Sequence, residues 1–168
     1  MNDLKRSQVD IAIFISGVLG IIAIDRFSKI FFSHLLDLNE SLILIRNVLH
    51  FTLVHNTGIA FGLFKDSDFV YFILPLVLTG LLIYNIYYYH YAQQLSRVYM
   101  VAFSLILGGA IGNLIDRICF GYVIDFIDLR VWPVFNIADS VITIGAVIIL
   151  FKCMRQQDHR VRNPRVRK

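Results

Sequence analysis

Charged residues are scarce in this chain, and cysteine and proline are scarcer still. Of its 168 residues 17% are charged and 57% apolar, and the mean hydropathy is +0.67. Soluble domains average about 25% charged residues, so this composition excludes an ordinary soluble domain and indicates a membrane protein. Cys119 and Cys153 fall at opposite ends of predicted membrane helices, which excludes a disulfide between them.

Common hydrolase motifs are also missing. The five histidines form no H-E-x-x-H motif and no pair four residues apart, so we expect no catalytic metal, and no other cofactor is indicated. No G-x-S-x-G segment is present to carry a catalytic serine. Ser140 is interpreted as satisfying a backbone group at a helix start. Any hydrolysis therefore has to use other side chains.

Four apolar stretches are long enough to cross a membrane as helices, which takes about 20 residues each. They cover residues 11–32, 69–89, 98–115 and 135–153. The segment from residue 152 onward holds seven Lys or Arg against one Asp, which predicts cytoplasmic termini by the positive-inside rule. We take residues 1–155 as one membrane-embedded, all-α domain and residues 156–168 as a basic, disordered cytoplasmic tail.

The loops that face outward in this topology are residues 33–68 and 116–134. Segment 41–64 is rich in β-branched and aromatic residues and is interrupted by Arg46-Asn47 and by Asn56-Thr57-Gly58. This pattern predicts a small β-sheet on the outer face of the membrane.

Polar residues within the apolar stretches lie toward their outer ends, where they can share one region. Asp25 and Lys29 are four residues apart in the first stretch and can form an ion pair on one helix face. We interpret them as structural support, because an ion pair makes two charges tolerable at this depth.

The third stretch ends in "GGAIGNLIDR". Gly108 and Gly112 form a pair of small residues that lets another helix approach closely. Asn113, Asp116 and Arg117 follow on one helix face. One role for Asp116 is to orient Arg117, whose guanidinium can point at a substrate carbonyl or a partner carboxylate.

Two carboxylates flank the start of the fourth stretch. Asp125 lies among valine, isoleucine and phenylalanine, an apolar setting that should raise its pKa. Asn136 and Asp139 are placed on the first turn of the helix, where the helix dipole favours an anion. Asp128 and Arg130 have more polar neighbours and are expected to be solvated.

Two carboxyl groups that share a water in a poorly solvated site do not both ionise easily. One then keeps a proton while the other stays charged. The charged one can deprotonate water, and the protonated one can donate to the carbonyl oxygen under attack, as in aspartic proteases. The residues therefore predict a hydrolytic pair, Asp125 and Asp139, provided that the fold brings them together.

Five ordered blocks resemble the lipoprotein signal peptidases, also called signal peptidase II, which are bacterial inner-membrane aspartyl proteases. The blocks are "DRFSK" (25–29), "NTGIAFG" (56–62), "GGAIGNLIDR" (108–117), "VIDF" (123–126) and "FNIAD" (135–139). The resemblance implies four transmembrane helices, a small periplasmic β-cradle, and catalysis near the outer leaflet by Asp125 and Asp139. It also implies residues that bind substrate or support the site: Asn56, Gly58, Asn113, Asp116, Arg117, Asn136, Asp25 and Lys29.

The substrate of this family is a prolipoprotein, whose signal peptide is cut just before a diacylglyceryl-modified cysteine. The resemblance implies the same substrate here, inhibition by the cyclic peptide globomycin, contact with membrane lipids, and a monomeric enzyme without nucleic acid. Because such a substrate already lies in the bilayer, the protease has to bring water to it. A carboxylate at the outer end of the fourth stretch suits that task.

Two other functions compete with this interpretation. A small ion- or proton-coupled transporter also places acids in a membrane, but it predicts acids spread through the membrane depth, whereas these gather toward one face. A non-catalytic scaffold explains the glycines of the third stretch but not the clustered Asn, Asp and Arg.

Overall fold

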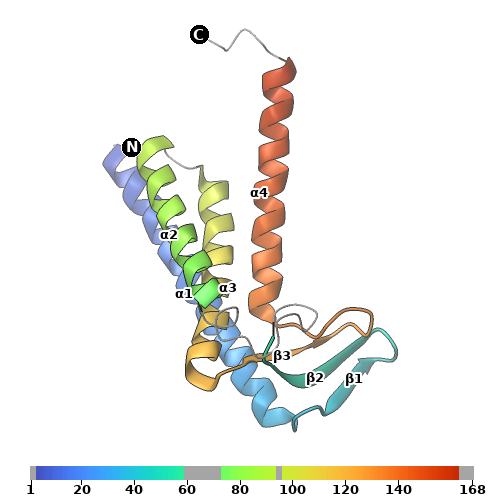
Figure 1. Ribbon diagram of the computed structural model, residues 1–168. Helices are drawn as coiled ribbons and strands as arrows, with labels where there is room; N and C mark the ends of the chain where they lie inside the picture. Colours follow the sequence, from blue (N-terminus) through green and yellow to red (C-terminus); the bar gives the residue numbers. More distant parts are fainter. Residues whose placement is uncertain (1–2, 59–72, 94–95, 163–168) are drawn as a thin grey trace.

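The computed structural model describes residues 3–58, 73–93 and 96–162 (Figure 1). Within these ranges the helices stand side by side and a small sheet lies across one end of them. Helix α1 begins, and α4 ends, at the other end. The helices are α1 (Asp3–Leu35), α2 (Leu74–Gln93), α3 (Arg97–Phe120) and α4 (Ile137–Arg162).

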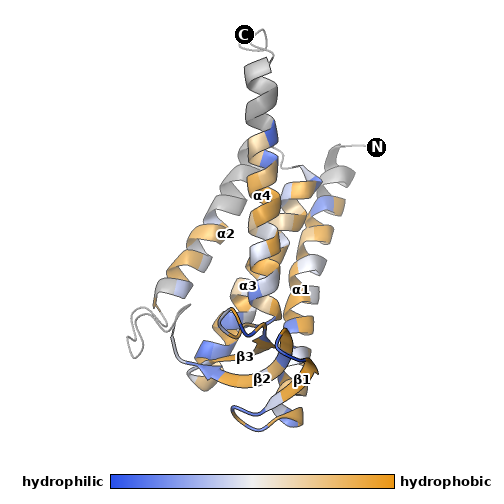
Figure 2. Cartoon of the chain, turned by 90° about the vertical axis from the view of Figure 1, so that its right-hand side faces the viewer, coloured by the Kyte–Doolittle hydropathy of each residue, from blue (hydrophilic) through white to orange (hydrophobic). Residues whose placement is uncertain are grey.

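Three helical segments in the described ranges are long and apolar enough to cross a membrane: Val9–Leu35, Arg97–Phe120 and Ile137–Arg155. Their shafts are largely hydrophobic (Figure 2), and side chains such as Phe27, 74% exposed, point outward. Apolar side chains on the outside of a helix suit lipid rather than water, so the chain is an integral membrane protein. Helix α2 carries a shorter apolar stretch, Pro75–Tyr84, and its crossing stays a prediction because residues 69–72 lie outside the described residues.

Helix α3 packs between α1 and α4 through glycines. A Cβ atom on Gly108 would lie 2.8 Å from the Cβ of Ile21 on α1, closer than side chains tolerate. On the α4 side, a Cβ atom on Gly109 would lie 2.6 Å from the carbonyl oxygen of Ala138. The predicted close approach at the small-residue pair is confirmed, and its partner helix is α1.

The sheet has three antiparallel strands in the order β1-β2-β3, formed by β1 (Ser41–Ile45), β2 (Leu49–Asn56) and β3 (Val123–Asp128). The hairpin turn falls at the predicted Arg46-Asn47 step, where Asn47 takes a φ of 61°, a conformation that asparagine tolerates well. The sheet predicted from segment 41–64 is present. Its third strand, β3, comes from a segment for which we did not predict a strand.

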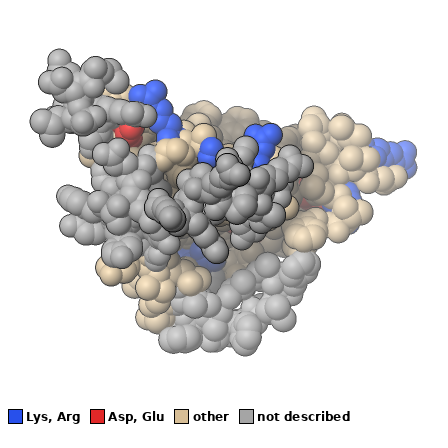
Figure 3. All heavy atoms as spheres, turned by 90° about the horizontal axis from the view of Figure 1, so that it is seen from above, with Lys and Arg blue, Asp and Glu red and all other residues tan. Residues whose placement is uncertain are grey.

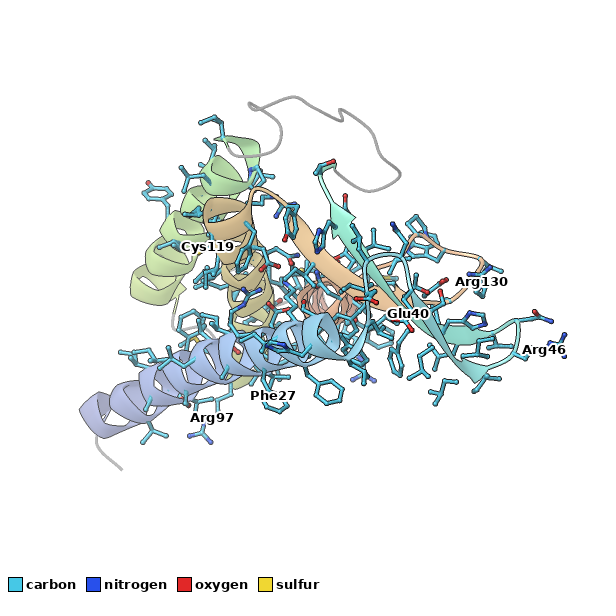
Figure 4. All side chains as sticks on the ribbon, turned by 90° about the horizontal axis from the view of Figure 1, so that it is seen from below. Phe27, Glu40, Arg46, Arg97, Cys119 and Arg130 are labelled. Atoms are coloured by element: carbon cyan, nitrogen blue, oxygen red, sulfur yellow. The ribbon has the colours of Figure 1, made fainter. Side chains whose placement is uncertain are left out.

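Aromatic packing attaches this sheet to α1. The ring of Phe32 lies 4.6 Å from that of Phe51 on β2 and 4.3 Å from that of Phe126 on β3, measured between centroids. Leu36 is buried against Leu53 beside this contact. Such stacking adds about 1 kcal/mol per ring pair to the burial of apolar area. It holds β3 at the end of α1, and the sheet projects sideways from there (Figure 4).

The start of α4 differs from the sequence prediction. We expected the fourth helix to begin at Phe135, but Phe135 forms a β-bridge with Ile127, and α4 begins at Ile137. The helix also continues to Arg162, inside the segment 156–168 that we took as a tail. The extended backbone before α4 lets Phe135 and β3 exchange hydrogen bonds, as in the 2.8 Å bond from the Ile127 N–H to the Phe135 carbonyl oxygen.

The end of the bundle away from the sheet shows Lys and Arg atoms at several places on its described surface (Figure 3). Arg97, at the start of α3, pairs there with Asp10 of α1, with 2.9 Å between Nε and Oδ1. Side chains of the buried carboxylates lie at the opposite end, near the sheet.

Candidate active site

A cavity of about 520 Å³ lies where the sheet meets the ends of α3 and α4. This volume is in the range of sites that bind small molecules or short peptide segments. Its polar lining comes from two strands and two helices: Asn56 on β2, Asn113 and Arg117 on α3, Asp125 on β3 and Asp139 on α4. Its apolar lining includes Val54, Val123, Trp132, Phe135 and Ile142.

Asn136 caps the first turn of α4 and fixes Asp139. The Oδ1 of Asn136 accepts a hydrogen bond of 3.0 Å from the Asp139 N–H, and the Oδ2 of Asp139 accepts one of 3.2 Å from the Asn136 N–H. This reciprocal arrangement is a capping box. It sets the orientation of Asp139 at a helix N-terminus, where the dipole favours a negative charge.

The side-chain amide of Asn136 joins the two carboxylates. Its Nδ2 donates to Oδ1 of Asp125 at 2.7 Å and to Oδ1 of Asn113 at 3.0 Å. Asn113 in turn donates from Nδ2 to Oδ1 of Asp139 at 2.8 Å. A third amide, Asn56, donates to Oδ2 of Asp125 at 2.9 Å. The structure therefore brings Asp125 and Asp139 to one cavity, held by uncharged amide donors.

Gly58 sets the direction of the Asn56 amide. The Gly58 N–H donates to Oδ1 of Asn56 at 3.0 Å, which turns the other end of that amide, Nδ2, toward Asp125. Both residues line the cavity. The remainder of the block "NTGIAFG", residues 59–62, lies outside the described residues.

The electrostatic setting of Asp125 favours its protonated form. The residue is 1% exposed, and burial, together with the negative charge of Asp139, raises its pKa to about 7. Hydrogen bonds from Asn56 and Asn136 and the charge of Lys29 act in the opposite direction. The predicted rise is confirmed, and at neutral pH Asp125 exchanges a proton readily.

A second polar cluster adjoins the cavity between α1 and α3. The Nζ of Lys29 lies 2.9 Å from Oδ2 of Asp25 and 2.7 Å from Oδ2 of Asp116, and all three side chains are fully buried. Arg26 also pairs with both carboxylates. The Asp25–Lys29 ion pair that we expected is therefore present, within a set of two acids and two bases whose charges balance.

Asp116 has a role beyond the one expected. Its two oxygens are engaged by Arg26, by Lys29 and by the N–H of Ile124, at 3.2 Å for the last. It thus joins α1, α3 and β3, a role that the sequence did not indicate, and the suggested orientation of Arg117 by Asp116 stays a prediction. Arg117 donates from Nη1 to the carbonyl oxygen of Asn113 at 3.3 Å and lines the cavity.

The expectation that Asp128 is solvated is wrong. Its side chain accepts hydrogen bonds of 2.9 Å from Thr52 and of 2.8 Å from the Arg130 N–H, and the residue is 5% exposed. Arg130 is exposed, as expected. Asp128 is not part of the cavity lining, so it offers a buried carboxylate on the same strand for comparison with Asp125.

Sequence reasoning missed three parts of the site. The Asn136-x-x-Asp139 spacing is a capping-box signal that would have placed Asn136 before the helix rather than inside it. The run of β-branched and aromatic residues around Asp125 would have indicated β3. The pairing of Arg26 with Asp116 spans 90 positions and left no local signal.

Other chemistries find less support in the described part of the chain. No group of three His, Cys, Asp or Glu side chains is arranged there to hold a metal ion. The Oγ of Ser140 donates to the carbonyl oxygen of Asn136 at 2.9 Å, so this hydroxyl satisfies a backbone group at the helix start.

Comparison with known proteins decides the family. The family model described as Signal peptidase (SPase) II matches residues 17–155. The chain belongs to the signal peptidase II family. Among curated relatives, the lipoprotein signal peptidase of Halothermothrix orenii is 38% identical over 140 residues, covering 83% of this chain and 94% of the relative. That of Moorella thermoacetica is 40% identical over 151 residues, covering 90% and 99%.

A solved structure agrees with the family assignment. A bacterial membrane enzyme, determined by the in meso method at 2.3 Å resolution, superposes with a TM-score of 0.78 at 28% identity, covering 89% of this chain and 92% of that one. Signal peptidase II enzymes are aspartic proteases that process lipoproteins in the membrane. The chain is therefore a membrane-embedded aspartic protease.

Proposed function

We propose that Asp125 and Asp139 are the catalytic pair of this signal peptidase, and that they cut prolipoproteins just before a diacylglyceryl-modified cysteine. The observation that carries the proposal is the joint attachment of both carboxylates to Asn136 at the wall of one cavity. Two buried carboxyl groups that act on each other electrostatically share protons, which is the requirement of an aspartic protease.

The proposed reaction needs one ionised and one protonated carboxyl group. The ionised one takes a proton from water as the water oxygen attacks the scissile carbonyl carbon. The protonated one donates to the carbonyl oxygen, and a tetrahedral intermediate forms. Transfer of a proton to the amide nitrogen then lets the C–N bond break. A pKa of about 7 for Asp125 suits either half of this exchange near neutral pH.

The remaining polar lining suits an extended peptide. Asn56, Asn113 and Arg117 present amide and guanidinium groups to the cavity, and we propose that they contact the substrate backbone and the inhibitor globomycin. Gly58 and Asn136 hold the amides in place. We propose that the buried set Asp25, Lys29 and Asp116 supports the site from outside the cavity lining, through the contact of Lys29 with Asn113.

The proposed orientation in the membrane rests on the charged side chains at the two ends of the helix bundle. We propose that α2 is a fourth span, that the termini are cytoplasmic, and that the sheet is a periplasmic β-cradle on a bacterial inner membrane. Lys and Arg at the end away from the sheet support this orientation (Figure 3). We further propose that residues 1–155 form a monomeric peptidase unit in contact with membrane lipids, and that the basic segment 156–168 helps to set its topology.

The test is cleavage of a diacylglyceryl-modified precursor by the purified protein in detergent. We expect Asp125→Asn and Asp139→Asn to lower kcat by at least about 10³-fold. The matched control is Asp128→Asn, which alters a buried carboxylate on the same strand outside the cavity and should keep most activity. Undiminished cleavage by either catalytic variant would refute the pair.

The same preparation tests the transporter alternative. Reconstituted vesicles should show no ion or proton flux above that of protein-free vesicles. Flux without precursor cleavage would favour a transporter over a peptidase. In the described residues the fully buried carboxylates gather near the sheet rather than through the membrane depth, which favours the peptidase.

A further inference from the structure

Lys29 is a buried cation that one amide, Asn113, connects to Asp139, and all three donors of its ammonium group are used. It is 0% exposed and contacts Oδ2 of Asp25 at 2.9 Å, Oδ2 of Asp116 at 2.7 Å and Oδ1 of Asn113 at 2.9 Å. Three donors thus meet three acceptors. The contacts with the two carboxylates neutralise the charge of Lys29. The third contact joins Lys29 to Asn113, which lines the cavity.

The contact with Lys29 determines which way the Asn113 amide points. An ammonium group only donates, so the oxygen of Asn113, rather than its nitrogen, has to face Lys29. The same oxygen accepts from Nδ2 of Asn136 at 3.0 Å. The nitrogen of Asn113 must then point the other way, to Oδ1 of Asp139 at 2.8 Å. Lys29 therefore controls a donor to Asp139.

The two carboxylates receive unequal support for a negative charge. Asp139 lies at the N-terminus of α4 and accepts a backbone N–H in addition to the Asn113 amide. The positive charges of both Lys29 and Arg117 act on it. Asp125 lies on a strand, accepts two side-chain amides and no backbone N–H among the hydrogen bonds of its side chain in the described residues, and the charge of Lys29 acts on it as well.

We infer that Lys29 is a positioning residue which, through Asn113, keeps Asp139 as the ionised member of the pair and leaves the proton on Asp125. The inference rests on the proposed function. It assigns the steps: Asp139 takes the proton from the attacking water, and Asp125 gives its proton to the carbonyl oxygen. On collapse of the intermediate, Asp139 returns a proton to the amide nitrogen as the C–N bond breaks, and Asp125 takes a proton back from a hydroxyl of the intermediate, which becomes the carboxylic acid product.

The charged groups that face the pair limit how a test can be designed. Helix α1 contributes Asp25, Arg26 and Lys29, and α3 contributes Asp116 and Arg117. Loss of Lys29 alone leaves two buried carboxylates short of a cation and endangers folding. The substitution Asp25→Asn removes one of those negative charges, so it is introduced together with each neutral replacement of Lys29.

The first experiment compares kcat/KM against pH for the full-length enzyme with a diacylglyceryl-modified precursor. The variants are Asp25→Asn alone, Asp25→Asn with Lys29→Gln, and Asp25→Asn with Lys29→Met. Glutamine keeps a donor for Asn113 without the charge, so we expect both limbs of its profile to move to higher pH by about one unit relative to Asp25→Asn. Methionine should show the same movement and a further loss in kcat of about tenfold to 100-fold, because the Asn113 oxygen then keeps only one of its two donors, the amide of Asn136.

A conservative variant guards against a purely structural effect. Lys29→Arg keeps the charge, so its profile should stay at the position of the parent even where kcat falls. A role confined to stability would lower activity in every Lys29 variant without moving either limb. Unmoved limbs in the glutamine and methionine variants would therefore overturn the positioning role.

The second experiment assigns the proton and does not depend on Lys29. Asp125→Asn should remove the basic limb of the profile and keep the acidic limb, whereas Asp139→Asn should remove the acidic limb. The reverse pattern would overturn the assignment. Failure of the parent to cleave, or full activity in both Asn variants, would refute the proposed function itself, while an active parent with unmoved limbs refutes only the inference.

Discussion

Two pairs of carboxylates, one fully buried and one at the cavity with Asp139 partly buried, are linked through Asn113 in this enzyme, and their partners differ. Asp25 and Asp116 are fully buried and form ion pairs with Lys29 and Arg26. Asp125 and Asp139, at the cavity, accept hydrogen bonds from the amides of Asn56, Asn113 and Asn136.

On the proposed function, the difference separates a structural use of carboxylates from a reactive one. A carboxylate that contacts buried cations directly connects the elements that carry them, as Asp116 does for α1 and α3. An amide donor holds the geometry of a carboxylate but adds no full charge, so protonation stays accessible. Burial and the negative charge of Asp139 raise the pKa of Asp125 to about 7, and the hydrogen bonds from its amide partners only partly offset this rise.

The largest effect is expected from breaking the ion-paired set. Asp116→Asn leaves Lys29 and Arg26 with one carboxylate between them, and loss of a partner from a buried ion pair costs about 3 to 5 kcal/mol. Equilibrium unfolding in mixed micelles measures it. Asp37→Asn, at an exposed carboxylate, is the control and should change the free energy of unfolding by less than about 0.5 kcal/mol. Equal stability of the two variants would show that the cluster is not structural.

A smaller effect is expected from removing one amide of the reactive pair. Asn56→Ala removes the donor to Oδ2 of Asp125, so kcat should fall about tenfold to 100-fold. That hydrogen bond lowers the pKa of Asp125, so its loss should also move the basic limb of the pH profile to higher pH. Thr57→Ala, at the exposed neighbour, should leave the limb in place. A shift to lower pH would contradict the assigned role of the amide.

The pH dependence of stability should differ in sign between two carboxylates of β3. The raised pKa of Asp125 means that its contribution to stability is present below the unfolded pKa and is lost as pH rises toward about 7. Burial also raises the pKa of Asp128, but hydrogen bonds from Arg130 and Thr52 outweigh burial and lower it, so its contribution is lost as pH falls.

Thermal unfolding of Asp125→Asn across about pH 4 to 7, and of Asp128→Asn across about pH 2 to 5, measures these slopes, because a carboxylate of raised pKa titrates above its ordinary range and one of lowered pKa below it. Relative to the parent, Asp125→Asn should gain stability as pH rises. The difference in stability between Asp128→Asn and the parent should become smaller as pH falls. Parallel curves for all three proteins would mean that the two environments do not differ.

The smallest effect is expected from metal removal. Neither pair of carboxylates belongs to a group of three potential metal ligands within the described residues, so a chelator should leave cleavage unchanged. Precursor cleavage with and without excess chelator measures this. Activity that is lost and then restored by added zinc would contradict a mechanism based on two carboxyl groups.

The reactive pair was more predictable from the sequence than the ion-paired set. Asp125 and Asp139 lie in short blocks whose local setting carries information: an apolar run around one and a helix start at the other. Helices α1, α3 and α4 were predictable because their apolar stretches are long. Lys29 and Asn113, in contrast, are 84 positions apart, and Asp116 meets Arg26 across 90. Such contacts depend on how α1 packs against α3, which no local pattern encodes.

Strand β3 shows the same limit. Its residues have the side chains of a strand, but the partner strand β2 lies about 70 positions earlier, as the 69-position hydrogen bond from Asn56 to Asp125 shows. Without that partner the segment around Asp125 was interpreted as part of a loop. The capping role of Asn136 was missed for a different reason, since its spacing signal was present but the helix was taken to begin at Phe135.

The central claim is that Asp125 and Asp139 act as one unit, and a double-mutant cycle tests it most directly. Single-turnover cleavage of a diacylglyceryl-modified precursor is measured for each single Asn variant and for the double variant. Residues that work as a unit are non-additive, so the double variant should be no more than about tenfold slower than the slower single variant. Losses that multiply, so that the double variant falls by the product of the two single losses, would show independent roles and contradict the account.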